Sequence, residues 1–241
     1  MKTHIIQKIL ISFILLFFLS TETKSQKEFI YENYFGFTGG IGYYHLNLNI
    51  QKKSEFVQGI SAGIVYKNFT ENFKSRFLMG SVFELNFSQK GGGNFVPVEV
   101  QIDDTTTGTA YVPYNLKLNY ITLSYLATAN IGKGKTRLNL YAGPEVGYLL
   151  SESLKFTLVE ITEGYKKNID FKTSFGLNFG AGIEREIGKS TVNIDFIYSH
   201  GLSNIYKSKT VNTALFYRNQ GFMLKLSYLI NLKRKKDVEN Q

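Results

Sequence analysis

The chain has 241 residues, a formal net charge of +9 and no cysteine or tryptophan, and 15% of its residues are aromatic. This length allows one large domain or two small ones. The absence of cysteine excludes disulfide bonds and thiolate zinc sites. The basic residues are scattered, and their one dense run, at 233–236, is typical of a solvated tail. We therefore expect no nucleic-acid partner.

The first 25 residues have the pattern of a cleaved export signal. Two lysines precede an apolar run over 9–19, which is too short to span a bilayer as a helix. The small residues Thr23 and Ser25 predict cleavage after Ser25. No later stretch approaches the roughly 20 apolar residues of a membrane helix. If the mature chain lies in a membrane, it must cross it as strands.

Alternation of apolar and polar residues is the main pattern of the mature chain, and this period of two is typical of strands. It is clear over 77–88, 137–151, 171–184, 192–199 and 222–230, and weaker over 35–47, 58–69 and 116–130. These segments predict eight strands, and a tilted membrane strand needs about 9–11 residues.

The connections between these segments alternate in length. Short ones are expected near 70–75, 131–135 and 188–189, and long ones near 48–57, 89–115, 152–169 and 201–219. In the long connection 89–115, the run Gly91–Gly93 predicts a flexible start. This alternation is typical of outer-membrane barrels, with short periplasmic turns, longer outer loops and both termini in the periplasm. We therefore predict an all-β protein, a single eight-stranded antiparallel up-and-down transmembrane β-barrel with a side-chain-filled interior.

The predicted organisation has four parts and no second domain. They are a signal peptide over 1–25, a short N-terminal segment over 26–34, the barrel over 35–232 and a basic periplasmic tail over 233–241. The pattern contains no apolar seam that would predict an oligomer, so we expect a monomer.

The stretch "YAGPEVGYLLS" at 141–151 combines a strand pattern with Pro144 and Glu145. In a barrel, Pro144 would face lipid at a bend or bulge near the rim. Glu145 would face inward and require a partner, because an unpaired buried charge is costly. The inward positions of the predicted strands hold further charges. We predict one buried charge network made of Glu84, Arg137, Glu145, Lys172, Glu184, Asp195 and Lys225.

A family resemblance rests on four stretches. "YAGPEVGYLLS", "FGLNFGAGIE", "YSHGLSNI" and "LNYITLSYLA" are similar to strands of the PorT-like outer-membrane β-barrel family of Bacteroidetes. The resemblance covers about 35–232 and implies an outer-membrane barrel. It also implies a role in protein secretion, which some PorT-like barrels have.

Two short motifs suggest other functions, phosphate binding and lipid hydrolysis. "GKGKT" at 132–136 lacks the earlier glycine of a phosphate-binding loop, so it predicts a hairpin turn. His200 and Ser203 lie at a predicted outer strand end, where a lipid hydrolase could place a serine nucleophile and its base. The same residues are ordinary turn formers. No histidine pair has ligand spacing, so we predict no metal site, and no motif predicts a cofactor.

The sequence thus predicts a non-enzymatic outer-membrane barrel that acts as a structural or interaction module. Its expected partners are outer-membrane lipid and other envelope or secretion proteins. Two alternatives stay open, a lipid hydrolase that uses His200 and Ser203 and a narrow channel.

Overall fold

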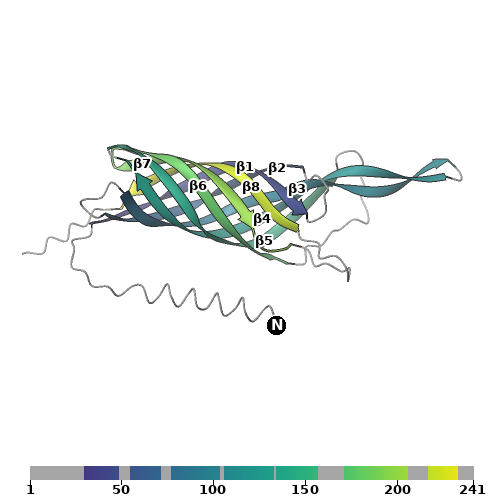
Figure 1. Cartoon of the computed structure of the whole chain (residues 1–241), viewed down its shortest axis with the longest axis horizontal. Coiled ribbons are helices and arrows are strands. Elements are labelled where there is room, and N and C mark those ends of the chain that lie inside the picture. The colour runs from purple at the N-terminus through teal and green to yellow at the C-terminus, as the bar shows by residue number, and fades with distance from the viewer. Residues whose placement is uncertain are drawn as a thin grey trace, which may run out of the picture.

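The computed structural model describes residues 30–48, 55–71, 77–103, 106–132, 134–156, 171–205 and 217–232. They form eight strands, β1 (Ile30–Leu48), β2 (Val57–Glu71), β3 (Phe77–Asp103), β4 (Thr106–Ile131), β5 (Thr136–Phe156), β6 (Thr173–Ile187), β7 (Ser190–Gly201) and β8 (Tyr217–Asn231). The strands follow chain order around one closed antiparallel barrel (Figure 1). The predicted fold class is confirmed. The expected signal peptide and basic tail lie outside the described residues.

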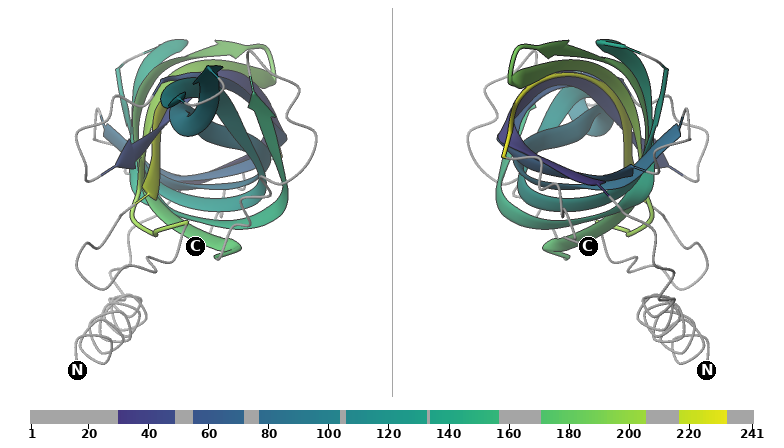
Figure 2. Two further views of the ribbon diagram at one scale, coloured as in Figure 1. Left: turned by 90° about the vertical axis from the view of Figure 1, so that its right-hand side faces the viewer. Right: turned by 90° about the vertical axis from the view of Figure 1, so that its left-hand side faces the viewer.

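The barrel closes where the first strand pairs with the last. The pairing of β1 with β8 runs from Tyr34 opposite Asn231 to Leu48 opposite Tyr217. Figure 2 shows the resulting ring of strands from both ends. The first strand begins at Ile30, earlier than the predicted start at 35, because its pairing with β2 continues to Glu71. In the described part of the chain, no helix has the length and apolar character to cross a membrane.

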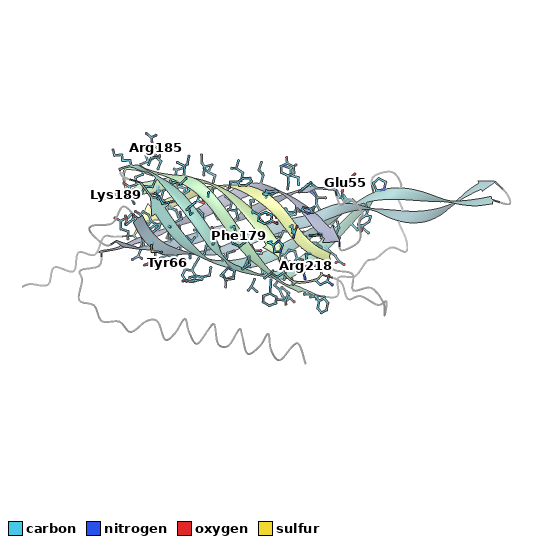
Figure 3. All side chains as sticks on the ribbon, in the orientation of Figure 1. Glu55, Tyr66, Phe179, Arg185, Lys189 and Arg218 are labelled. Atoms are coloured by element: carbon cyan, nitrogen blue, oxygen red, sulfur yellow. The ribbon has the colours of Figure 1, made fainter. Side chains whose placement is uncertain are left out.

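The outer wall of the barrel is apolar between two polar ends. Phe179 projects from the middle of the wall, Arg185 and Lys189 lie at the short-turn end, and Glu55 and Arg218 lie at the loop end (Figure 3). Large apolar side chains cover the wall between them, among them Phe37, Ile41, Ile60, Phe83, Leu123, Val146, Phe175, Ile194, Phe196, Leu224 and Leu226. Such a band is the lipid-facing surface of an outer-membrane barrel.

Pro144 faces outward as predicted, but it lies in the middle of β5 rather than near the rim. The pairing of β4 with β5 is interrupted there, between Ser124 opposite Glu145 and Ala127 opposite Ala142. A Cβ at Gly143 would lie 2.0 Å from the carbonyl oxygen of Tyr125, so the two strands approach closely beside the proline. The interrupted ladder explains why a residue without an N–H is accepted.

The predicted loop 89–115 is wrong, because most of it is strand. β3 continues to Asp103 and β4 starts at Thr106, so the two strands form a ribbon that projects beyond the barrel (Figure 1). Pro97 stands opposite Tyr111 and Pro113 opposite Phe95. Proline predicts a loop, but a strand accepts it where its missing N–H faces an open edge.

The run Gly91–Gly93 serves close packing instead of the predicted flexibility. These glycines are buried within β3 and pair with β4, and Gly93 also bridges to Glu55. Gly91 has a φ of 149°, and a Cβ there would lie 1.9 Å from the carbonyl oxygen of Leu116. Only glycine fits this position, where the ribbon leaves the barrel.

A closed barrel predicts a specific behaviour on gels. We expect the unboiled protein in SDS to migrate differently from the boiled protein, because the ladder from β1 to β8 resists detergent until it is heated. Semi-native electrophoresis measures this, with the boiled sample as the control. A single unshifted band under both conditions would contradict a closed barrel.

Candidate functional site

Among the described residues, three ion pairs lie inside the barrel, and each joins strands that are not neighbours. Lys67 on β2 lies 3.3 Å from Glu184 on β6, and Lys225 on β8 lies 2.5 Å from Glu84 on β3. Lys90 on β3 pairs with Glu145 on β5. The pairs therefore connect separate parts of the wall through the interior.

Neutral side chains donate further hydrogen bonds to the carboxylates of these pairs. Asn130 and Asn139 donate to Glu184 at 3.2 and 3.3 Å. Asn178 donates to Glu145 at 3.1 Å and accepts a hydrogen bond from the hydroxyl of Ser199 at 2.6 Å. Buried charges need such additional hydrogen bonds to offset their loss of water.

Asp195 is the one buried acid without a described ion pair. It stands opposite Lys225 in the pairing of β7 with β8 and is 4% exposed. Its Oδ1 atom has no hydrogen-bond partner among the described residues. The hydroxyl of Tyr141 accepts from Lys67 at 2.8 Å and is hydrogen-bonded to Asp195. Tyr141 thus joins Asp195 to the Lys67–Glu184 pair.

The predicted charge network needs two corrections. Five of its members lie inside the barrel, namely Glu84, Glu145, Glu184, Asp195 and Lys225. Four of them belong to three separate ion pairs instead of one network, and Asp195 is in none of these pairs. Arg137 lies at the short-turn end and pairs with Glu186 at 3.0 Å, because β5 has only just begun there. Lys172 is exposed, since β6 starts one residue later and the alternation does not yet apply.

Sequence reasoning missed two of the three buried lysines. Lys67 lies between Val65 and Phe69, which are also buried, in a segment with weak alternation. Lys90 continues the inward series of Asn86 and Ser88, but it falls within the predicted loop 89–115. Extending the period of two past residue 88 would have found Lys90.

Apolar clusters fill the interior near both ends. The cluster near the short-turn end contains Tyr34, Val65, Phe69, Leu78, Val82, Leu126, Tyr141 and Leu229. The cluster near the loop end contains Leu46, Tyr114, Leu116, Leu118, Tyr120, Leu149 and Ile205. The interior is thus less polar than the sequence suggested. With its ion pairs, it is packed with side chains, as expected for a barrel this narrow.

A small pocket lies at the loop end beside the Lys90–Glu145 pair. Its volume is about 20 Å³, which is room for about one water molecule. The polar side chains that line it come from five strands and the start of one loop, and they include Lys90, Glu145, Asn178, His200, Ser203 and Asn219.

His200 and Ser203 both line this pocket, but their described hydrogen bonds go elsewhere. The Nδ1 atom of His200 lies 3.0 Å from the Nε2 atom of Gln220 and 3.3 Å from the hydroxyl of Tyr198. The Ser203 hydroxyl accepts from the backbone N–H of Phe175 at 2.9 Å. No described hydrogen bond joins the serine to the histidine, and none joins a carboxylate to His200. Among the described residues, no three His, Cys, Asp or Glu side chains form a metal site.

The Lys225–Glu84 pair predicts a stability effect. Lys225→Met should lower the free energy of unfolding by about 3–5 kcal/mol, because Glu84 then remains buried without its partner. The double variant Lys225→Met with Glu84→Gln should recover a large part of this loss. Urea unfolding in lipid vesicles measures both, and Lys189→Met, at an exposed turn residue, is the control. Equal stability of all variants would contradict a structural role for the pair.

Comparison with solved structures finds barrels of low similarity. The attachment invasion locus protein Ail of Yersinia pestis, solved in complex with the heparin analogue sucrose octasulfate, has 12% sequence identity and a TM-score of 0.38, with 83% of this chain and 99% of that chain covered. The outer membrane protein AlkL in lipid bilayers has 15% identity and a TM-score of 0.27, with 88% and 94% covered. Likeness at this level carries no inference about binding. No curated protein matches the chain.

Comparison of the sequence with models of protein families finds a match over most of the chain. The family model described as "Outer membrane protein beta-barrel domain" matches residues 25–207, which is most of the chain and includes seven of the eight strands. The match agrees with the closed barrel and its apolar outer wall, and it places the protein in the outer membrane. This chain therefore belongs to the outer membrane protein beta-barrel domain family.

Proposed function

We propose that the protein is a non-enzymatic interaction module, in which the barrel is the membrane anchor and the β3–β4 ribbon is the part that binds a partner protein. The ribbon is the observation that carries this proposal. Its strands pair with each other from Asn94 opposite Tyr114 to Asp103 opposite Thr106. It projects from the loop end, which faces the cell exterior in barrels of this kind (Figure 1).

The isolation of the ribbon supports a binding role. Beyond Gly93, no other described strand pairs with β3, and β5 pairs with β4 only as far as Tyr114. A two-stranded hairpin alone is marginally stable in water, and a third strand or a packed surface stabilises it. A partner that pairs with an edge or packs on a face of the ribbon would supply that surface.

The described contacts argue against both alternatives, the narrow channel and the lipid hydrolase. The apolar clusters and the three ion pairs occupy the path that a channel would need. A hydrolase needs a hydrogen-bonded serine and base with a group that orients the base. The described contacts of His200 and Ser203 hold strands and loop backbone together instead.

The similarity to PorT-like barrels of Bacteroidetes supports a narrower form of the proposal. In that form, the partner is an envelope protein and the module assists protein secretion across the outer membrane. The stretches that carry this similarity lie in the barrel strands, and they do not identify the part that binds a partner. The ribbon is therefore the part to test for a role in secretion.

The proposal predicts position-dependent crosslinking in the native membrane. A photo-reactive residue at Thr107, near the ribbon tip, should capture one partner protein reproducibly and in near-stoichiometric yield. The same residue at Lys135, in an exposed turn at the opposite end, should not capture it. Mass spectrometry of the adducts measures both.

Removal of the ribbon gives the matching loss-of-function test. Val96 and Val112 stand opposite each other, so an Asn-Gly turn can join them and replace 97–111. This variant should still show the barrel gel shift but should lose the partner and any secretion role. Equal capture from positions 107 and 135 would overturn the proposal, and wild-type secretion by the shortened variant would overturn its narrower form.

The packed interior also predicts an electrical result. Purified protein in planar lipid bilayers should give no discrete conductance steps, because side chains fill the lumen near both ends. Single-channel recording measures this, with a large porin reconstituted in parallel as the positive control. Regular steps from folded protein would restore the channel alternative.

A further inference from the structure

We propose that the partner protein binds the ribbon by adding an extended basic strand to the free edge of β4 over residues 107–111. This inference rests on the proposed function, and it names the edge that is used and the chemistry of the partner. The direction of the backbone hydrogen-bonding groups, two prolines and the charge of the ribbon carry it.

The contacts of Gly93 fix which backbone groups of the ribbon face outward. Its N–H and C=O both bond to Glu55, at 2.9 and 3.0 Å, so they point away from β4. Successive residues of an antiparallel strand direct these groups to opposite sides. The register is unbroken from Gly93 opposite Asn115 to Gln101 opposite Thr107. Over this stretch, the odd-numbered residues of both strands therefore direct their N–H and C=O groups to the free edges.

Two prolines occupy such outward positions, and they affect the two edges differently. Pro97 removes an N–H from the middle of the β3 edge, so a strand added there would lose a central hydrogen bond. Pro113 is the next residue of β4 beyond its last pair with β5, Tyr114 opposite Phe156. The missing N–H of Pro113 explains why the pairing with β5 ends at this point.

The β4 edge is continuous beyond Pro113. Thr107, Thr109 and Tyr111 each direct an N–H and a C=O to it, and no other described strand pairs with β4 there. Exposed edges are commonly protected by prolines and charged residues. The run 107–111, "TGTAY", contains neither, whereas the β3 edge has both. This run can therefore accept the main-chain hydrogen bonds of an added strand.

The charge of the ribbon selects a basic partner strand. Residues 91–116 hold three acids, Glu99, Asp103 and Asp104, and no lysine or arginine, although the whole chain has a net charge of +9. Opposite charge speeds association and suppresses acidic competitors. A third strand would also stabilise the ribbon, because two strands alone are marginal in water.

Proline substitutions test which edge is used. Thr109→Pro removes a donor from the middle of the β4 edge and places a ring there, so capture of the partner from photo-reactive position 107 in the native membrane should fall by about ten-fold or more. Gln101→Pro removes an N–H from the β3 edge and should leave the yield unchanged. Neither N–H bonds within the ribbon. The gel shift and slow hydrogen exchange of the Ala110 amide verify that both variants fold.

A peptide library tests the chemistry of the partner strand. Random nonapeptides displayed on phage and selected on the mature barrel in nanodiscs should be enriched in basic sequences. The selected peptides should bind Thr109→Pro about ten-fold or more weakly than wild type. The double variant Glu99→Gln with Asp103→Asn should lose the preference for basic sequences.

The outcomes separate this inference from the proposed function. If the wild-type ribbon captures no partner, the proposed function fails. If it captures one but Thr109→Pro does so equally well, or Gln101→Pro loses as much, only the inference about the β4 edge is overturned. It is also overturned if the library yields no basic peptides, or if position 107 crosslinks to residues 157–161 of this same chain.

Discussion

The hydrocarbon core of a membrane contains no water, so every backbone N–H and C=O group that crosses it must find a partner within the protein. For a chain of strands, only a closed ring satisfies this condition, and the pairing of β1 with β8 closes it. Closure also divides each strand into two faces. One face takes the apolar residues that contact lipid, and the other must fill a narrow lumen.

The lumen is filled in two ways that complement each other. Apolar clusters occupy the two ends, where aromatic and leucine side chains pack together. Between and beside them, long lysine side chains reach across to carboxylates on distant strands. A buried ion pair adds little stability compared with apolar packing, but it penalises every arrangement that separates the charges. The pairs therefore favour one register of the barrel over its alternatives.

The eight strands could be predicted because a lipid-facing wall imposes a strict period of two, which is clear in "FKTSFGLNFGAGIE" and in Phe77–Ser88. The buried positions of Glu84, Glu145, Glu184, Asp195 and Lys225 follow from the same period. The ribbon could not be predicted in this way, because Gly91, Pro97 and Pro113 are typical of loops when their neighbours are unknown. Which lysine meets which carboxylate was also beyond the pattern. It depends on how strands far apart in the chain face each other across the lumen.

Seven of the eight strand pairings join segments that follow each other along the chain, and each can form as a local hairpin. The pairing of β1 with β8 differs, because almost the whole chain separates Tyr34 from Asn231. Loop-closure entropy delays such a contact until the intervening chain is ordered. Barrel formation therefore has a late, all-or-none step, before which two unpaired strand edges must be kept from lipid and from other chains. A polypeptide shortened before Tyr217 would lack the strand that completes the ring, so the edges of β1 and β7 would both stay unpaired.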